Sequence, residues 1–177
     1  MSSYENWPTI ELSTNNTLLR PEAMPELVHM EDPAINVMVD FKLAKAFTIH
    51  LHEAIDHALN EMKINGVHML LVIDGEKLVG LVSTEDILGE KPIMMMHERR
   101  IPRERICVET VMTPVTDIIV FDIESLKHAK IGNIIQTLKS KNQHYALVVR
   151  NINHDEQWIR GLFSSSLINK KLHRNIS

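Results

Sequence analysis

The short run Ser83-Thr84-Glu85-Asp86 carries the side chains best suited to binding chemistry in this sequence. It follows an apolar stretch and predicts the start of a helix, with Ser83 as N-cap and Asp86 at the third helical position. A carboxylate just inside a helix can accept charge-assisted hydrogen bonds from two neighbouring hydroxyl groups, and the free N–H groups of a helix start favour an anion. The same run is also an ordinary capping arrangement, and the two roles can coexist.

The other reactive side chains form no recognisable catalytic or metal-binding pattern. His52-Glu53 is followed by His57, and histidines five positions apart lie about 140° apart round a helix, so they share no face as zinc ligands would. Cys107 is the single cysteine. A disulfide within the chain and a cysteine-rich zinc cluster are therefore excluded, and no base or oxyanion site for a thiol nucleophile is evident. We expect no metal, no catalytic residue and no enzymatic activity.

The sequence contains an internal repeat. Residues 55–73 align without a gap with residues 131–149, and two further blocks recur in the same order. Three blocks in one order indicate a duplicated unit of roughly 75 residues. The two further blocks are Gly80 to Ser83, which recurs as Gly161 to Ser164, and Val37-Met38, which recurs as Val111-Met112.

Each unit predicts the order strand, helix, strand, strand, helix. In the first unit, apolar residues recur at helical spacing from Ile55, and Asn65-Gly66 supplies a left-handed stop. The apolar runs 69–73 and 78–82, joined by the tight-turn signal Asp74-Gly75, predict a hairpin, and a short strand at 47–49 precedes the helix. A lone unit would bury too little apolar surface, so we expect the two units to pack sheet against sheet around a shared core.

Composition places the chain among ordinary folded proteins. With 177 residues, of which 44% are apolar and 24% charged, it has room for one domain or two small packed ones. The net charge of −4 gives no global basic field, so we expect no nucleic-acid partner. No stretch approaches 18 consecutive apolar residues and the N-terminus lacks a secretory signal, so we expect no membrane partner and a cytoplasmic location.

Two segments lie outside the repeat. The first 33 residues hold four of the seven prolines and six acidic residues against the single Arg20, which indicates an irregular arm. The segment 90–106 contains Met94-Met95-Met96 and four arginines. Adjacent methionines point to different sides of a helix, so burial by another helix or subunit is the simplest account, and an adaptable partner-binding surface is the alternative. The apolar residues of the arm that could dock on a neighbouring subunit are Trp7, Ile10, Leu18, Leu19 and Leu27.

Together these features resemble a tandem pair of CBS domains, the module named after cystathionine beta-synthase. The resemblance is carried by residues 67–74, by Gly80 to Leu88 and by Val111-Met112-Thr113-Pro114, and it covers residues 35–170. It implies an α+β fold in which two pseudo-twofold-related β-α-β-β-α motifs pack as one CBS pair. We assign residues 1–34 to an N-terminal arm, 35–89 to CBS motif 1, 90–106 to a connector and 107–177 to CBS motif 2.

The resemblance also implies a function. Such pairs are regulatory, non-catalytic modules that sense an adenosine-containing ligand, such as AMP, ADP, ATP or S-adenosylmethionine, in the cleft between the motifs. No cofactor is required, and the nucleotide or S-adenosylmethionine acts as a regulatory ligand. Because CBS pairs commonly dimerise through their helices, we expect a homodimer that acts on an unidentified protein target.

The resemblance assigns roles to particular residues. Asp86 would hold the ribose hydroxyls, and Ser83 and His68 would face phosphate, although His68 at a strand start is also typical of a structural histidine. Phe47 and Val67 would line the adenine slot. Met69 stands where many relatives that bind polyphosphates have Arg, which favours a ligand with less phosphate charge.

The second copy departs from this pattern, because Leu167 replaces the carboxylate. We therefore expect at most one competent nucleoside site per chain, built around Ser83 and Asp86, with Ser164 and His144 as weaker polar contacts on the other side. The alternative is a ligand-independent interaction or scaffold module with a vestigial cleft, in which the connector and the arm bind a partner. The implied nucleotide-binding residues are Asp86, Ser83, His68, Phe47, Val67, Ser164 and His144.

Overall fold

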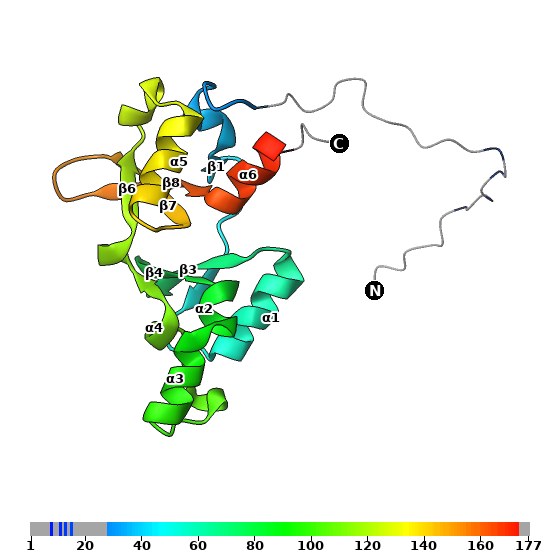
Figure 1. Cartoon of the computed structure of the whole chain (residues 1–177), viewed down its shortest axis with the longest axis vertical. Helices are drawn as coiled ribbons and strands as arrows, with labels where there is room; N and C mark the ends of the chain where they lie inside the picture. Colours follow the sequence, from blue (N-terminus) through cyan, green and yellow to red (C-terminus); the bar gives the residue numbers. More distant parts are fainter. Residues whose placement is uncertain (1–7, 9–10, 12, 14, 16–27, 174–177) are drawn as a thin grey trace, which may run out of the picture.

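The computed structural model describes residues 8, 11, 13, 15 and 28–173. The apolar residues expected to dock from the N-terminal arm (Trp7, Ile10, Leu18, Leu19 and Leu27) all lie outside these residues. The described chain forms two four-stranded sheets stacked one above the other, with helices on their outer faces (Figure 1). This arrangement confirms the predicted α+β pair of like motifs.

The first sheet contains the hairpin predicted from the first repeat. The helix before the hairpin ends at Gly66, and the hairpin turn contains Gly75. Both glycines adopt the left-handed conformation, with φ of 65° at Gly66 and 61° at Gly75. Asn142, at the position that matches Gly66 in the second repeat, has φ of 50°. The strands, in sheet order, are β2 (Thr48–His50), β3 (Met69–Asp74), β4 (Lys77–Ser83) and β5 (Thr113–Pro114), and the helices are α1 (Ile55–Asn65), α2 (Thr84–Leu88), α3 (Glu90–Glu98) and α4 (Val108–Val111).

The second sheet repeats this architecture with a longer hairpin loop, which spans residues 152–156. In both sheets the first strand of the repeat pairs in parallel with the next strand, which then forms the antiparallel hairpin. The strands, in sheet order, are β1 (Val39–Asp40), β8 (Gln157–Ser164), β7 (Tyr145–Asn151) and β6 (Ile119–Asp122), and the helices are α5 (Ile131–Ser140) and α6 (Ser165–His173). The short 3-10 helices are η1 (Ala34–Val37), η2 (Arg103–Arg105), η3 (Val115–Asp117) and η4 (Ser125–His128).

The two sheets exchange their short edge strands, which the order of the repeats did not predict. Strand β1 precedes the first hairpin in sequence but pairs with β8 of the second sheet, where Val39 lies opposite Leu162. Strand β5 precedes the second hairpin but pairs with β4 of the first sheet, where Thr113 lies opposite Leu81. Each hydrophobic core therefore includes a segment from the other half of the sequence.

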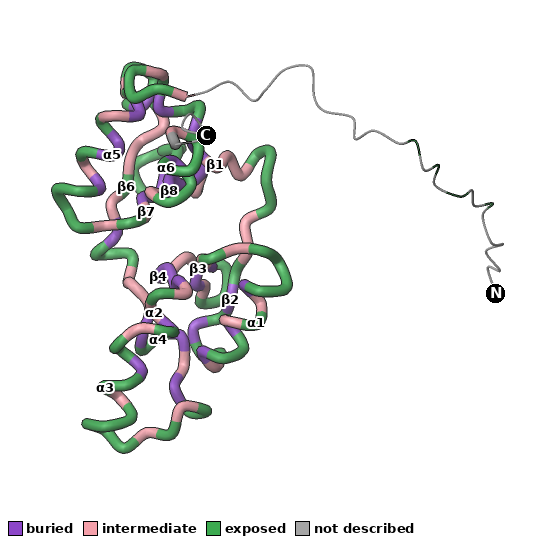
Figure 2. Tube along the Cα trace, turned by 45° about the vertical axis from the view of Figure 1, so that its right-hand side comes forward, coloured by how far each residue is buried: buried purple, intermediate pink, exposed green. Residues whose placement is uncertain are grey.

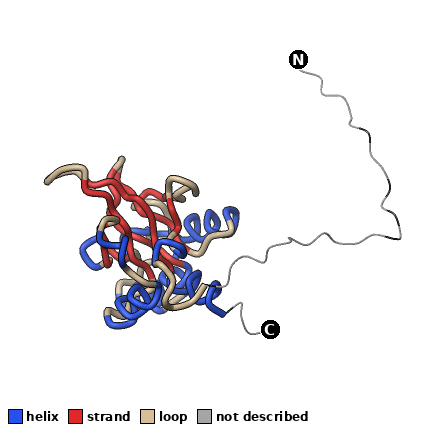
Figure 3. The backbone as a smooth tube through the Cα atoms, turned by 90° about the horizontal axis from the view of Figure 1, so that it is seen from above, coloured by secondary structure: helices blue, strands red, loops and turns tan. Residues whose placement is uncertain are grey.

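A third apolar cluster joins the two sheets face to face. Its buried members include Leu71 and Leu147, which match one another in the repeat, and Leu81 and Leu162, which also match. Figure 3 looks along the stack, so that the strands of the two sheets overlie one another, and Figure 2 shows the buried residues concentrated on the strands and on the helix faces toward them. The pockets described below both border this inter-sheet cluster.

Helix α3 extends away from the sheets at one end of the molecule (Figure 1). Met95 packs against the hydrophobic core beneath the first sheet, whereas Met94 and Met96 are 51% and 42% exposed. A single chain thus covers only Met95 of the three adjacent methionines, and that only in part. Among the described helices, none combines the length and the apolar character needed to cross a membrane.

Candidate functional site

Asp86 forms the capping box that the sequence predicted. Ser83 Oγ accepts a hydrogen bond from the Asp86 backbone N–H at 3.2 Å, and Asp86 Oδ2 accepts from the Ser83 backbone N–H and from Ser83 Oγ, each at 3.0 Å. The side chain of Asp86 is only 17% exposed. One carboxylate oxygen is therefore committed to the start of α2.

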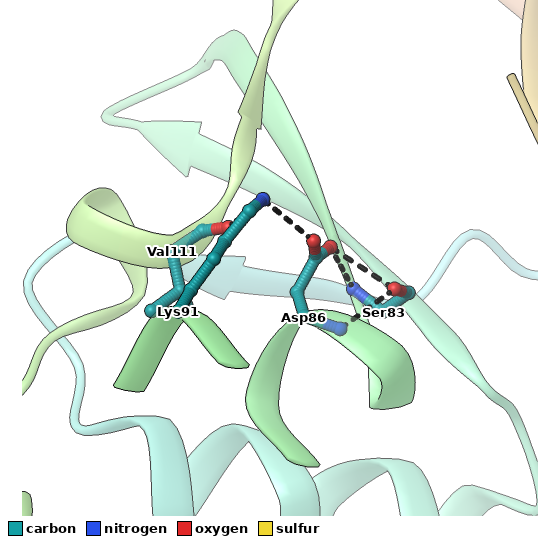
Figure 4. Close-up of polar contacts among 4 residues, drawn as sticks. All are labelled: Ser83, Asp86, Lys91 and Val111. Carbon is teal, nitrogen blue, oxygen red and sulfur yellow. Dashed lines mark hydrogen bonds and ion pairs between the residues drawn. The ribbon is translucent and has the colours of Figure 1, made fainter. Parts of the chain in front are cut away.

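Lys91 binds the other oxygen of this carboxylate, a contact that sequence reasoning did not predict. Its Nζ lies 2.8 Å from Asp86 Oδ1 and also donates to the Val111 carbonyl at 2.8 Å (Figure 4). Because Lys91 lies in the first turn of α3, this ion pair links the start of α2 to α3 and to the end of α4. A ribose diol that bound Asp86 would have to compete with Lys91 and with the cap.

A small polar pocket of about 170 Å³ lies beside Asp86. The first motif contributes the helix start, and the second motif contributes the loop before β7. Two carboxylates, those of Glu85 and Asp86, make its lining acidic. We call it the Asp86 pocket, and its lining residues include Ser83, Glu85, Asp86, Thr113, Gln143, His144 and Tyr145.

A larger and more apolar pocket of about 280 Å³ also borders the inter-sheet cluster. Here the first motif contributes the loop before β3, and the second motif contributes the start of α6. The ammonium of Lys45 lies 5.5 Å from the centre of the Phe47 ring at this site. We call it the Phe47 pocket, and its lining residues include Phe41, Lys45, Phe47, Val67, His68, Tyr145, Ser164, Ser166 and Leu167.

The structure divides the implied nucleotide-binding residues between these two pockets. Ser83, Asp86 and His144 line the Asp86 pocket, whereas Phe47, Val67, His68 and Ser164 line the Phe47 pocket. The single site that would combine an adenine slot from Phe47 and Val67 with a ribose contact from Asp86 is not formed. The reason is that each pocket combines the strand start of one motif with the helix start of the other.

The two pockets are related by the internal repeat. His68 matches His144, and Ser83 matches Ser164, whereas Asp86 of one pocket matches Leu167 of the other. Within the described chain, the residues that line the Phe47 pocket include no Asp or Glu. The pockets therefore differ most in charge, since acidic side chains line one and Lys45 is the cationic side chain at the other.

Tyr145 lines both pockets, and sequence reasoning did not identify it. The only signal for Tyr145 was that it aligns with Met69 when the two repeats are superimposed. Burial raises the pKa of the Tyr145 phenol to about 12, and the negative charges of Glu85 and Asp86 add to this effect. Tyr145 is consequently a neutral hydrogen-bonding group between the pockets. Among the described residues, no three His, Cys, Asp or Glu side chains are placed to hold a metal ion.

The raised pKa of Tyr145 predicts a loss of stability at alkaline pH. Between pH 10 and pH 12 the unfolded chain has lost the phenolic proton while the folded chain keeps it, so the free energy of unfolding falls as the pH rises. Below pH 10, where Tyr145 is protonated in the folded and the unfolded chain, this loss of unfolding free energy is absent. We expect urea unfolding midpoints at pH 9 and pH 11 to differ less in Tyr145→Phe than in the unmodified chain. Equal differences in the two proteins would contradict the placement of Tyr145.

Comparison with known proteins identifies the fold. Residues 35–92 match the family model of the CBS domain. An uncharacterized conserved protein from Pyrococcus horikoshii is similar to this chain, with a TM-score of 0.57 and 18% identity over 85% of this chain and 98% of the other. A CBS-pair protein from Arabidopsis thaliana has a TM-score of 0.54 and 18% identity, covering 81% of this chain and 95% of the other. No curated protein sequence matches the chain.

A larger protein also contains this fold. GMP reductase from Trypanosoma brucei has a TM-score of 0.56 and 18% identity to this chain over 79% of its length. This chain spans only 27% of the length of that enzyme. Structures of the same GMP reductase in complex with guanosine 5'-monophosphate and with guanosine 5'-triphosphate are likewise similar. At these identities the likeness establishes the fold.

Proposed function

We propose that this chain, whose residues 35–92 match the CBS domain model and whose two motifs face each other, is a regulatory, non-catalytic module that binds an adenosine-containing ligand between the motifs. The ligand class is AMP, ADP, ATP or S-adenosylmethionine. Nucleotide complexes of the GMP reductase, which contains this fold over part of its length, support a nucleotide as the kind of ligand. Binding would change the relative tilt of the motifs, and a partner protein would respond to that change.

The Phe47 pocket is the observation that carries this proposal. It is a concave and mostly apolar cavity with a few polar groups at one side, which is the usual character of a small-molecule site. A planar base would lie between Phe47 and Val67. The hydroxyl of Ser164 and the imidazole of His68 would then meet the sugar and phosphate. The start of α6 is on the same wall and favours an anionic group.

A titration with a pair of matched variants tests the proposal. Melting temperature and calorimetric binding are measured with AMP, ADP, ATP and S-adenosylmethionine. A ligand at one hundred times its Kd stabilises the fold by roughly 2.7 kcal/mol. Val67→Trp fills the Phe47 pocket and is expected to abolish binding, whereas Gln143→Trp, at the matching position of the Asp86 pocket, is the control that keeps it. Melting curves unmoved by all four compounds would refute the proposal.

A second candidate function is a ligand-independent interaction or scaffold module. The commitment of Asp86 to Ser83 and Lys91 favours it, because the carboxylate that would hold a ribose is already engaged. The exposed side chains of α3, including Met94 and Met96, would then contact the partner. The same titration separates the two functions, since this candidate predicts that no nucleotide alters the melting temperature.

A further inference from the structure

We infer that the Phe47 pocket selects its ligand by the base and by an anionic phosphate, and that it is indifferent to the 2′-hydroxyl of the sugar. The ligand class is then an adenine nucleoside monophosphate in either its ribose or its deoxyribose form. This inference rests on the proposed function and narrows it. It departs from the expectation that a carboxylate holding the sugar is the central contact.

The sugar has no carboxylate to bind in this pocket. Leu167 stands where the other motif has Asp86, and its apolar side chain is 40% exposed at the pocket. The nearby hydroxyls of Ser164 and Ser166 lie 3.1 Å apart and hydrogen-bond to one another. A 2′-hydroxyl that meets leucine gains no charge-assisted hydrogen bond, so its removal costs little binding free energy.

The charges around the pocket favour an anion. The Lys45 ammonium is held over the Phe47 ring at 5.5 Å from its centre, which places a cation beside the proposed base slot. The pocket lining also includes Ser164 and Ser166 at the start of α6, a helix of nine residues whose dipole favours a phosphate there. The Ser165 N–H donates to the His144 carbonyl and the Leu167 N–H to Ser164 Oγ, so the Ser166 N–H is the donor of the first three left for that phosphate. S-adenosylmethionine, which carries a sulfonium and an ammonium group, would meet like charge at Lys45.

The size of the pocket favours a small nucleotide. A cavity of about 280 Å³ lies just below the usual volume of small-molecule sites, which is about 300–1,000 Å³. The neighbouring Asp86 pocket is smaller, and its Glu85 and Asp86 side chains would repel additional phosphates that extended toward it. A monophosphate therefore fits the pocket better than a dinucleotide or a triphosphate does.

Calorimetry on the full chain with AMP, 2′-deoxy-AMP and adenosine tests the inference. We expect AMP and 2′-deoxy-AMP to bind with Kd values within about threefold of one another, and adenosine to bind about tenfold or more weakly. A preference for AMP over 2′-deoxy-AMP of tenfold or more would overturn the inference while leaving the proposed function intact. Absence of binding by every nucleotide would refute the proposed function and the inference with it.

A substitution that creates discrimination provides a second, independent test. Leu167→Asp places a carboxylate at the sugar position, so the preference for AMP over 2′-deoxy-AMP should rise about tenfold or more, whereas the uncharged control Leu167→Asn should change it less. An unchanged preference in Leu167→Asp would show that the sugar does not lie at this wall. Lys45→Met should likewise weaken the binding of AMP but not the binding of adenosine. The control Lys42→Met, on the same loop but outside the pocket, should change the binding of neither compound.

Discussion

The two halves of this chain, cut between residues 106 and 107, are expected not to fold separately. The cut follows the sequence repeat, so each fragment keeps one complete hairpin and its main helices. It nevertheless removes from each core the segment that crosses over from the other half. Fragment 1–106 lacks Val108 and Val111, and fragment 107–177 lacks Ala34, Val37 and Met38; all five side chains are buried in the cores that they leave.

The size of this effect follows from burial. A fully buried aliphatic side chain contributes about 1.5–3 kcal/mol, and domains of this kind are stable by only about 5–15 kcal/mol. Each fragment would also expose its face of the inter-sheet cluster, which includes Leu71 and Leu147. The combined loss is comparable to the whole stability of the fold.

Thermal unfolding followed by circular dichroism measures this result. We expect neither fragment alone to show a cooperative transition, and we expect a mixture of the two fragments to regain one. The mixture is the control, because it contains every residue of the intact chain. A sharp transition in fragment 107–177 alone would mean that the exchanged segment around Val37 is dispensable.

The exchange also explains two of the three repeated blocks. A Cβ atom added at Gly161 would lie 2.6 Å from the Val39 carbonyl oxygen and 3.0 Å from Met38 Sδ. A Cβ atom at Gly80 would lie 2.7 Å from Met112 Sδ and 2.7 Å from the Thr113 carbonyl oxygen. The Val-Met block and the Gly block therefore recur together because they contact one another between the motifs.

Most of the fold could be predicted from the sequence because its signals are local. The stop at Gly66, the turn at Gly75 and the cap at Ser83 depend on residues within a few positions, and all are present in the structure. The exchanged strands are different. Each has only two residues, such as Thr113 and Pro114, and such a short strand has no detectable alternation.

The candidate site could be predicted only in its parts. The resemblance to CBS domains implied that Phe47, Val67 and Asp86 form one binding site, because they belong to one motif. The packing of the two sheets separates them and brings each against the other motif. Lys45 and Lys91 were missed for a related reason, since a flexible lysine reaches its partner by tertiary contact and leaves no periodic pattern.

Asp86→Ala is the substitution that distinguishes a structural from a ligand-binding carboxylate. We expect it to lower the free energy of unfolding by about 1–3 kcal/mol, because it leaves the half-buried backbone N–H of Ser83 unsatisfied and removes the partner of Lys91. Urea unfolding measures this loss. Glu85→Ala, in the same helical turn and the same pocket but outside the capping box, is the matched control and should cost less.

Nucleotide binding by Asp86→Ala then separates the two roles. With the protein held well below its melting temperature, we expect its Kd for AMP to equal that of the unmodified chain, because the Phe47 pocket is lined without Asp86. If Asp86 instead bound the ribose, the Kd would rise about tenfold or more. Lys91→Met provides the converse measurement. It frees one oxygen of Asp86 without removing the carboxylate, so it should tighten AMP binding only if the nucleotide occupies the Asp86 pocket.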